Sequence, residues 1–354
     1  MDDDILDYKR VKPVAVWLYF CAFSIFAMAI IGAITRLTES GLSMVEWRPL
    51  MGALPPMDAA EWDRVFELYK TSPEYQKVNK GMSLPEFQKI FFWEWFHRFW
   101  GRAIGVIYFV PFLIFLSIKR IPRIYMPSFW GFLVLGAAQG LMGWYMVKSG
   151  LVDQPDVSHY RLAAHLGLAF LLFALLLHMA IKFSVPPSPE KAMLAPLHKP
   201  VKRALFLLII TVFYGVLVAG LKAGLIYNTF PMMGETIWPS EGLDMTPLWK
   251  NFVENHATVQ FIHRLLATLT FFSILSVIVK SMNFRKSIRV SRAFGFMGFV
   301  LVIQVTLGIL TLLTQVAIPL AVLHQGGAML LLATMIWTMH ELPPTDYSFD
   351  KDDK

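Results

Sequence analysis

Four histidines recur at matching places in a very apolar chain. Two of them stand at the mouth of an apolar run, in segment 92–102 (FWEWFHRFWGR) and, in a weaker copy, in segment 260–265 (QFIHRL). Each is followed at a similar distance by another histidine inside an apolar run. Titratable groups within a membrane are costly and usually functional. The sequence therefore predicts a twofold repeat with two histidine pairs, which are His97 with His165 and His263 with His324.

The chemistry that suits these histidines is axial ligation of two hemes. Imidazole is a good ligand of heme iron, and two facing helices can hold the macrocycle between them. Zinc and dinuclear carboxylate sites fit less well, because the chain has one cysteine, Cys21, and few carboxylates in its apolar runs. A lone histidine of this kind is more often a packing residue, but repetition in register favours ligands. Heme propionates need cationic partners, and the candidates for propionate binding or positioning are Arg36, Arg98, Arg102, Arg161 and Arg264.

The two copies differ at one position. Three residues before His97 stands Glu94, whereas three residues before His263 stands Gln260. Residues three apart share a helix face, so Glu94 is expected to approach the same ligand as His97 and to accept protons or stabilise a cation there. This asymmetry predicts a reacting N-terminal half and an electron-relaying C-terminal half. The alternative is that Glu94 caps a helix turn or pairs with Arg98.

Composition assigns these residues to a membrane protein. Hydrophobic residues make up 56% of the 354 positions and only 16% are charged, which is too apolar for a soluble domain. An apolar run of about 20 residues is long enough to cross a bilayer. Eight such runs are expected, near 14–35, 98–118, 128–147, 160–181, 203–223, 258–280, 293–314 and 317–338. The predicted fold class is therefore all-α integral membrane, with eight transmembrane helices.

Charge orients the predicted helices. The net charge is +7, and the basic residues gather in alternate loops near 119–126, 182–203 and 280–292, which the positive-inside rule assigns to the cytoplasm together with both termini. This distribution favours a membrane surface over nucleic acid as the partner of the positive charge. The acidic start fits neither a cleaved secretory signal nor an Arg-rich transit peptide, so a bacterial cytoplasmic membrane is predicted. Structural or solvated roles are expected for His159, His178, His198, His256 and His340.

Each half of the chain is expected to contain four helices. Segments 40–42 (SGL) and 223–225 (AGL) are each followed at nearly the same distance by a Pro-x-x-Gly turn, at 49–52 and at 231–234. An even number of crossings gives two halves of the same orientation, related by a pseudo-twofold axis along the membrane normal. The predicted segments are an N-terminal half 1–182 with an outer loop 36–96, a cytoplasmic linker 183–203, a C-terminal half 204–340 and a cytoplasmic tail 341–354. The outer loop is interpreted either as short amphipathic helices that cap a site or as a plain connection.

Three motifs resemble those of the heme A synthase family, in its longer branch from proteobacteria and mitochondria. They are residues 32–43 (GAITRLTESGLS), then 47–49 (WRP) with Gly52 and 55–56 (PP), and 94–98 (EWFHR) with 101–102 (GR). The likeness covers essentially the whole chain, including the two later histidines, and the first motif is specific. The shorter branch carries a cysteine pair in an outer loop. This chain lacks that pair, so any mechanism that needs the disulfide does not transfer.

The resemblance implies an enzyme that oxidises the C8 methyl group of heme O to a formyl group through a hydroxymethyl intermediate, making heme A for cytochrome oxidase. By position, it implies that His97 and His165 hold the substrate heme while Glu94 assists the oxidation. It implies likewise that His263 and His324 ligate a heme B cofactor. Heme O synthase is an expected partner, and the farnesyl tail of heme O favours entry from the lipid bilayer. The electron-transfer partner and a homo-oligomeric state stay open.

Two other functions fit parts of this pattern. A di-heme b-type electron-transfer cytochrome would have the same histidine pairs, but it would hold heme B at both sites and make no altered porphyrin. A transporter would also have repeated halves, yet with helix-breaking residues near mid-membrane rather than titratable groups at the outer face. Glu94 in one half only favours the enzyme. Three glycines of the third run are spaced for close helix packing, namely Gly136, Gly140 and Gly143.

Overall fold

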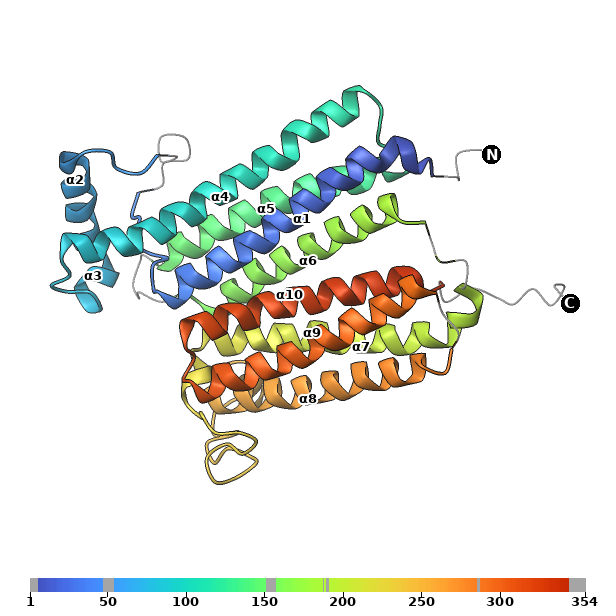
Figure 1. Ribbon diagram of the computed structural model, residues 1–354. Coiled ribbons are helices and arrows are strands. Elements are labelled where there is room, and N and C mark those ends of the chain that lie inside the picture. Colours follow the sequence, from blue (N-terminus) through green and yellow to red (C-terminus); the bar gives the residue numbers. More distant parts are fainter. Residues whose placement is uncertain are drawn as a thin grey trace, which may run out of the picture. The chain divides into compact units, whose positions relative to one another are not determined.

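The computed structural model describes residues 6–46, 54–150, 157–186, 188, 191–284 and 287–343. Within these ranges the regular elements are helices, apart from one isolated bridge between Met233 and Thr236 (Figure 1). Eight of the described helices are long and apolar enough to cross a membrane, which confirms the predicted fold class. They are α1 (Tyr8–Leu37), α4 (Leu84–Ser117), α5 (Met126–Gly150), α6 (His159–Ser184), α7 (Lys191–Gly220), α8 (His256–Ser281), α9 (Ile288–Leu313) and α10 (Ile318–Glu341). The shorter helices are α2 (Ala59–Lys70), α3 (Pro73–Lys77), η2 (Arg123–Tyr125), η3 (Ala223–Leu225) and η4 (Leu248–Phe252).

The chain forms two compact units. The first unit is residues 23–172, and the second is residues 1–22 together with 173–354. The first unit holds α4, α5 and half of α1, and it contains both His97 and His165. The second unit holds α7 to α10 with His263 and His324. Each predicted histidine pair therefore lies within one unit. The halves 1–182 and 204–340 and their pseudo-twofold axis remain predictions.

In the first unit, α4 begins much earlier than its apolar run. The sequence predicted a start near residue 98, whereas the helix begins at Leu84. The N–H and hydroxyl groups of Ser83 both donate to a carboxylate oxygen of Glu86, at 2.8 and 2.7 Å, as in a capping box. Hydropathy misses this start because polar residues interrupt the apolar ones in the first turns, namely Glu86, Gln88 and Lys89. His97 therefore lies more than three turns inside α4. Its place at the mouth of the apolar run near 98–118 predicted that it stands at the start of the helix, and this prediction is wrong.

The early turns of α4 carry a small cap made of α2 and α3 (Figure 1). The expectation of short helices in the outer loop is confirmed for these two. Phe87 of α4 stacks on Phe66 and Tyr69 of α2, with ring centroids 5.0 and 4.9 Å apart. Aromatic pairs of this kind contribute about 0.5–1.5 kcal/mol beyond simple burial. Residues 47–53, which hold the predicted WRP motif and Gly52, lie outside the described residues, as do 344–354 of the predicted tail.

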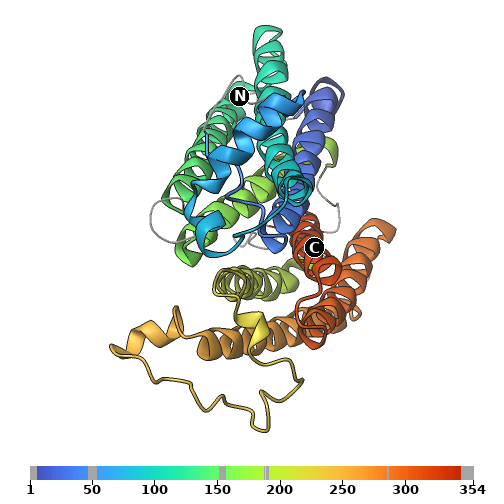
Figure 2. The same ribbon diagram turned by 90° about the vertical axis from the view of Figure 1, so that its left-hand side faces the viewer.

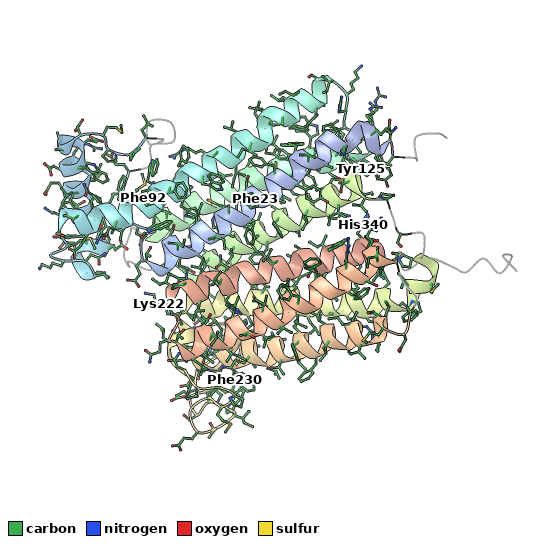
Figure 3. The ribbon with its side chains drawn as sticks, viewed as in Figure 1. Phe23, Phe92, Tyr125, Lys222, Phe230 and His340 are labelled. Atoms are coloured by element: carbon green, nitrogen blue, oxygen red, sulfur yellow. The ribbon has the colours of Figure 1, made fainter. Side chains whose placement is uncertain are left out.

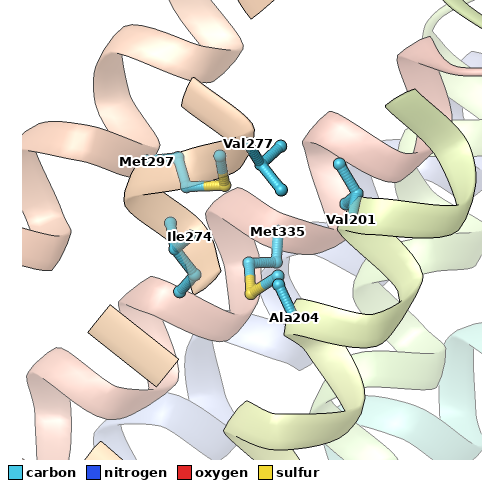
Figure 4. Close-up of a pocket in the computed structure, with 6 residues that line it drawn as sticks. All are labelled: Val201, Ala204, Ile274, Val277, Met297 and Met335. Atoms are coloured by element: carbon cyan, nitrogen blue, oxygen red, sulfur yellow. The ribbon is translucent and has the colours of Figure 1, made fainter. Parts of the chain in front are cut away.

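In the second unit, α7 to α10 lie side by side (Figures 1 and 2). Contacts join α7 to α8, α8 to α9, α9 to α10 and α10 back to α7, which closes a four-helix arrangement. Figure 4 shows a small space in its core lined only by buried apolar side chains from all four helices, and without a titratable group it is packing rather than a reactive site. Its lining residues are Val201, Ala204, Ile274, Val277, Met297 and Met335.

Helix α7 also begins earlier than predicted, at Lys191 rather than near residue 203. Much of the expected linker 183–203 is therefore helical. Leu194, Leu197 and Val201 are fully buried at helical spacing, and this apolar stripe explains why the helix extends through a segment rich in lysine and proline.

Figure 3 shows Lys222 and Phe230 at one end of the second unit and His340 at the opposite end. The Nε2 atom of His340 donates to the carbonyl oxygen of Val185 at 2.9 Å. This hydrogen bond gives His340 a structural partner, in agreement with the role expected for it.

Candidate functional site

In the first unit, α4 and α6 bring His97 and His165 together. The two imidazoles are close enough to interact electrostatically. His165 lies about one and a half turns inside α6, as expected from the sequence. Both histidine residues are half-buried, and the Nε2 atom of His165 lies 3.4 Å from the side-chain nitrogen of Gln139 on α5.

Glu94 is buried one helical turn before His97, with 2% of the residue exposed. Its Oε2 atom accepts hydrogen bonds from the hydroxyl of Ser43 at 2.7 Å and from the N–H of Met44 at 2.6 Å. Its Oε1 atom accepts from the guanidinium of Arg98 at 2.5 Å. Three donors, one of them cationic, fix the direction of the carboxylate. The alternative interpretation, in which Glu94 pairs with Arg98, is therefore also present. The ion pair orients the carboxylate, which stays one helical turn from His97.

Gln260 has the corresponding place in α8 but different chemistry. Its side-chain nitrogen donates to the carbonyl oxygen of Tyr227 at 3.0 Å, while its Oε1 atom is buried without a hydrogen-bond partner in the described structure. An amide at this position holds the outer loop as Glu94 does. It does not ionise, so it offers no base to a reacting group.

In the second unit, α8 and α10 bring His263 and His324 together, again within electrostatic reach. The Nδ1 atom of His263 lies 3.1 Å from the carbonyl oxygen of Thr211 on α7. A carbonyl oxygen only accepts, so Nδ1 carries the hydrogen and Nε2 keeps its lone pair. This is the tautomer in which a histidine ligates a metal through Nε2.

These donor sets fit one heme in each unit. Both units offer two imidazoles from different helices, which is the number of axial positions on heme iron. The Nδ1 atoms of His165 and His324 are buried and have no hydrogen-bond partner within the described residues. At Nδ1, neither ring has the hydrogen bond that a buried structural histidine usually makes.

Arg98 and Arg264, each directly after a histidine, bind the carbonyl groups of an outer loop. The acceptors are Met44 and Glu46 for Arg98, and Tyr227, Thr229 and Met232 for Arg264, at 2.8 to 3.3 Å. In both units, an arginine next to a histidine thus holds an outer loop against the helix that carries this histidine. Of the two roles expected for these arginines, the contacts support positioning, while propionate binding remains a prediction.

The other candidate arginines are distributed over the first unit. Arg161 of α6 lies over the ring of Tyr145, 4.9 Å from its centroid. Arg36 stands in the last turn of α1, and Arg102 follows Arg98 by one turn of α4. Their contact with a heme propionate likewise remains a prediction.

The sequence reasoning missed the glycines that face the histidines. A Cβ atom built on Gly143 would lie 3.0 Å from the Cε1 atom of His165, whereas one on Gly136 or Gly140 meets nothing within 4 Å. The spacing of these glycines suggested helix packing for all three of them, but only the contact of Gly143 with His165 distinguishes one from the others. A signal was available, because the pattern Gln-x-x-x-Gly occurs twice, at 139–143 and at 304–308.

Comparison with known proteins covers both units. The family model described as cytochrome oxidase assembly protein, COX15-CtaA, matches residues 15–336. The heme A synthase of Rhodospirillum centenum is 49% identical over 336 residues, which cover 95% of this chain and 90% of that protein. The heme A synthase of Nitrosospira multiformis is 46% identical over 334 residues and 94% of each chain. The heme A synthase of Flavobacterium psychrophilum is 41% identical over 336 residues, which cover 94% of this chain and 98% of that protein. With eight membrane-competent helices, the chain is a multi-pass membrane protein.

Proposed function

The chain belongs to the COX15-CtaA family of cytochrome oxidase assembly proteins, and we propose that it is a heme A synthase, an oxidoreductase that converts the C8 methyl group of heme O to a formyl group. The names of its relatives support this activity. The observation that carries it in this chain is the buried Glu94 carboxylate one turn from His97, with Gln260 at the same place in the second unit. At this position, one unit therefore has a carboxylate that can accept a proton and the other has an amide that cannot.

The proposed reaction needs a proton acceptor near the methyl group. With water as the oxygen source, conversion of methyl to hydroxymethyl consumes one water and releases two protons and two electrons. Oxidation of hydroxymethyl to formyl releases two more of each, and the four electrons in total would pass to the electron-transfer partner of the enzyme. Glu94 would accept these protons in turn, and its charge would stabilise positive charge that develops at the methyl carbon. Ser43, Met44 and Arg98 hold the carboxylate in one direction, so little reorganisation is needed during the reaction.

The histidine pairs would divide between substrate and cofactor. His97 and His165 would hold the iron of heme O, and His263 and His324 would ligate heme B. A bound heme B supplies a one-electron relay. Gln260 beside His263 provides no proton acceptor, which suits a site that passes electrons and leaves its porphyrin unchanged.

The source of the new oxygen atom defines two routes. In one, His97 or His165 leaves the substrate iron so that dioxygen can approach. In the other, water attacks the oxidised methyl centre beside Glu94. Turnover in oxygen-18-labelled water separates them when later exchange of the formyl oxygen is controlled. A hydroxymethyl product without oxygen-18 would rule out the water route.

The proposal includes a location and a supplier. The basic segments near 119–126, 182–203 and 280–292 support a cytoplasmic side that also holds both termini. The similar proteins are from bacteria, which supports the bacterial cytoplasmic membrane. Heme O is apolar because of its tail, so entry from the bilayer is expected. Heme O synthase would then be a partner that delivers the substrate.

Heme extraction tests the proposed function. The protein is expressed with and without a heme O synthase, and its hemes are extracted and identified by mass-resolved chromatography. We expect heme A or its hydroxymethyl precursor only when the synthase is present. Heme B alone, at two per chain in both cases, would make the protein an electron-transferring cytochrome. Absence of any heme would contradict both functions.

A further inference from the structure

The four histidines differ in how closely a neighbouring helix approaches them. Each ring faces a glycine, and the separation is measured from a Cβ atom built on that glycine to the nearest ring atom. It is 2.8 Å for Gly308 and His324, 3.0 Å for Gly143 and His165, 3.0 Å for Gly215 and His263, and 3.7 Å for Gly32 and His97. Real Cβ atoms almost never come closer than 3.0 Å to another heavy atom, whereas 3.7 Å is ordinary contact. A Cβ atom on Gly308 would therefore overlap His324, and one on Gly143 or Gly215 would force a shift of a few tenths of an ångström. A Cβ atom on Gly32 would fit beside His97.

The same three histidines contact the main chain one turn before the glycine. Thr211, whose carbonyl accepts from His263, precedes Gly215 by four residues. Gln139 and Gln304 likewise precede Gly143 and Gly308 by four residues, and their main chains lie near His165 and His324, although the Nδ1 atoms of these two rings make no hydrogen bond within the described residues. A helix carbonyl points toward the residue four positions later, so a side chain there would cover it. Within the described residues, His97 has no such main-chain contact.

We propose that Gly143, Gly215 and Gly308 are positioning residues, each of which uncovers a helix carbonyl so that an axial histidine can direct its Nδ1 hydrogen to it. The carbonyl has two lone pairs, so it accepts from the histidine and from its own helix together. The ring is then held in the tautomer and direction that present Nε2 to iron.

The glycine–histidine contacts also differ between the two proposed heme sites, and the assignment of these sites rests on the proposed function. Both ligands of the resident heme B, His263 and His324, are held closely by a neighbouring helix. Of the two ligands of the substrate heme, His165 is held closely by its neighbouring helix, whereas His97 has room to shift. Substrate and product hemes must enter and leave, whereas the cofactor stays. His97 is therefore the ligand that yields during exchange.

The test uses Gly215→Ala and Gly308→Ala, expressed without heme O synthase so that heme B is measured alone. We expect about a 10-fold or greater loss of heme B affinity. In the heme that remains, electron paramagnetic resonance should show a high-spin signal in place of the low-spin signal of two histidine ligands. Its midpoint potential should rise, because a ligand without the Nδ1 hydrogen bond is less basic and stabilises ferric iron less.

Matched glycines serve as controls. A Cβ atom on Gly140 of α5 meets nothing within 4 Å, and one on Gly298 of α9 meets the end of Ile278 at 3.3 Å. Gly140→Ala and Gly298→Ala should keep the wild-type heme content and spectrum, and so should Gly32→Ala. Gly143→Ala, with heme O synthase present, should lose heme O and heme A while it retains heme B.

Wild-type low-spin heme B with an unchanged potential in folded Gly215→Ala and Gly308→Ala would overturn the inference. The two variants address one heme from two helices, so either of them suffices if the other does not fold. A wild-type measurement needs no variant, because proton electron–nuclear double resonance detects the Nδ1 hydrogens of the ferric heme. Slow exchange of these hydrogens with deuterium supports the proposal and fast exchange contradicts it. A wild type without heme B would instead refute the proposed function.

Discussion

At the scale of single residues, the two units differ most at one side chain. Glu94 and Gln260 both stand one turn before a histidine, and both bind the outer loop of their own unit. The shared contact explains why a polar residue is needed at the position. The difference in charge then distinguishes a site that can accept a proton from one that cannot.

Glu94→Gln tests this assignment with little change of shape. We expect heme A formation to fall by about 10²–10⁴-fold, as for the loss of a general base. The heme content should persist, because the histidine ligands are intact, and heme O should accumulate. The control is Glu67→Gln, which changes an exposed carboxylate that pairs with Lys70. Unchanged heme A formation in Glu94→Gln would refute the role of this carboxylate.

Arg98 gives a second prediction at this scale. The side chains of Arg98 and Glu94 are 10% and 3% exposed, so Arg98→Leu would leave a buried carboxylate without its cation. Breaking a buried ion pair typically costs about 3–5 kcal/mol of stability. Arg264→Leu removes only hydrogen bonds to loop carbonyls and should cost about 1–3 kcal/mol. Thermal unfolding in detergent measures both, and equal losses would contradict the account.

At the scale of elements, the outer end of α4 is where the sequence misled most. Hydropathy places a span correctly, but it does not detect a helix that continues beyond the apolar run. The continuation from Leu84 depends on the cap at Ser83 and on the contact of Phe87 with α2. Such contacts depend on which element packs alongside, and periodicity within one helix does not specify that partner.

The cap on α4 should lose stability as pH rises. Glu74 of α3 is 5% exposed, and one of its carboxylate oxygens has no hydrogen-bond partner in the described structure. Burial first, and the charge of Glu94 second, raise the pKa of Glu74 from 4.5 to about 8. The folded cap therefore retains a proton that the unfolded chain releases above pH 4.5. Its stability should decline from about pH 4.5 until Glu74 ionises near pH 8.

Hydrogen–deuterium exchange of α2 and α3 between pH 5 and pH 9, corrected for intrinsic exchange rates, measures this effect. Opening of the wild-type cap should become easier as pH rises, and Glu74→Gln should remove most of that dependence. The same pH dependence in both proteins would show that another group controls the cap.

At the scale of the whole molecule, the sequence predicted the eight helices and the repeated histidines. Both are encoded locally, by apolar length and by spacing. It did not predict that Gly143 and Gly308 face histidines, or that Arg98 and Arg264 hold loops. Those contacts depend on how each helix is rotated about its axis and on which neighbour it meets. The paired Gln-x-x-x-Gly pattern was visible, but its meaning required the adjacent helix.

The central claim is that one unit holds the substrate heme and the other a resident heme B. The most direct measurement is the identity of the hemes retained by His165→Ala and by His324→Ala, each expressed with a heme O synthase. We predict that His165→Ala keeps one heme B per chain and loses heme O and heme A. We predict that His324→Ala loses heme B and still binds heme O. Loss of the same heme from both variants would contradict the division between the two units.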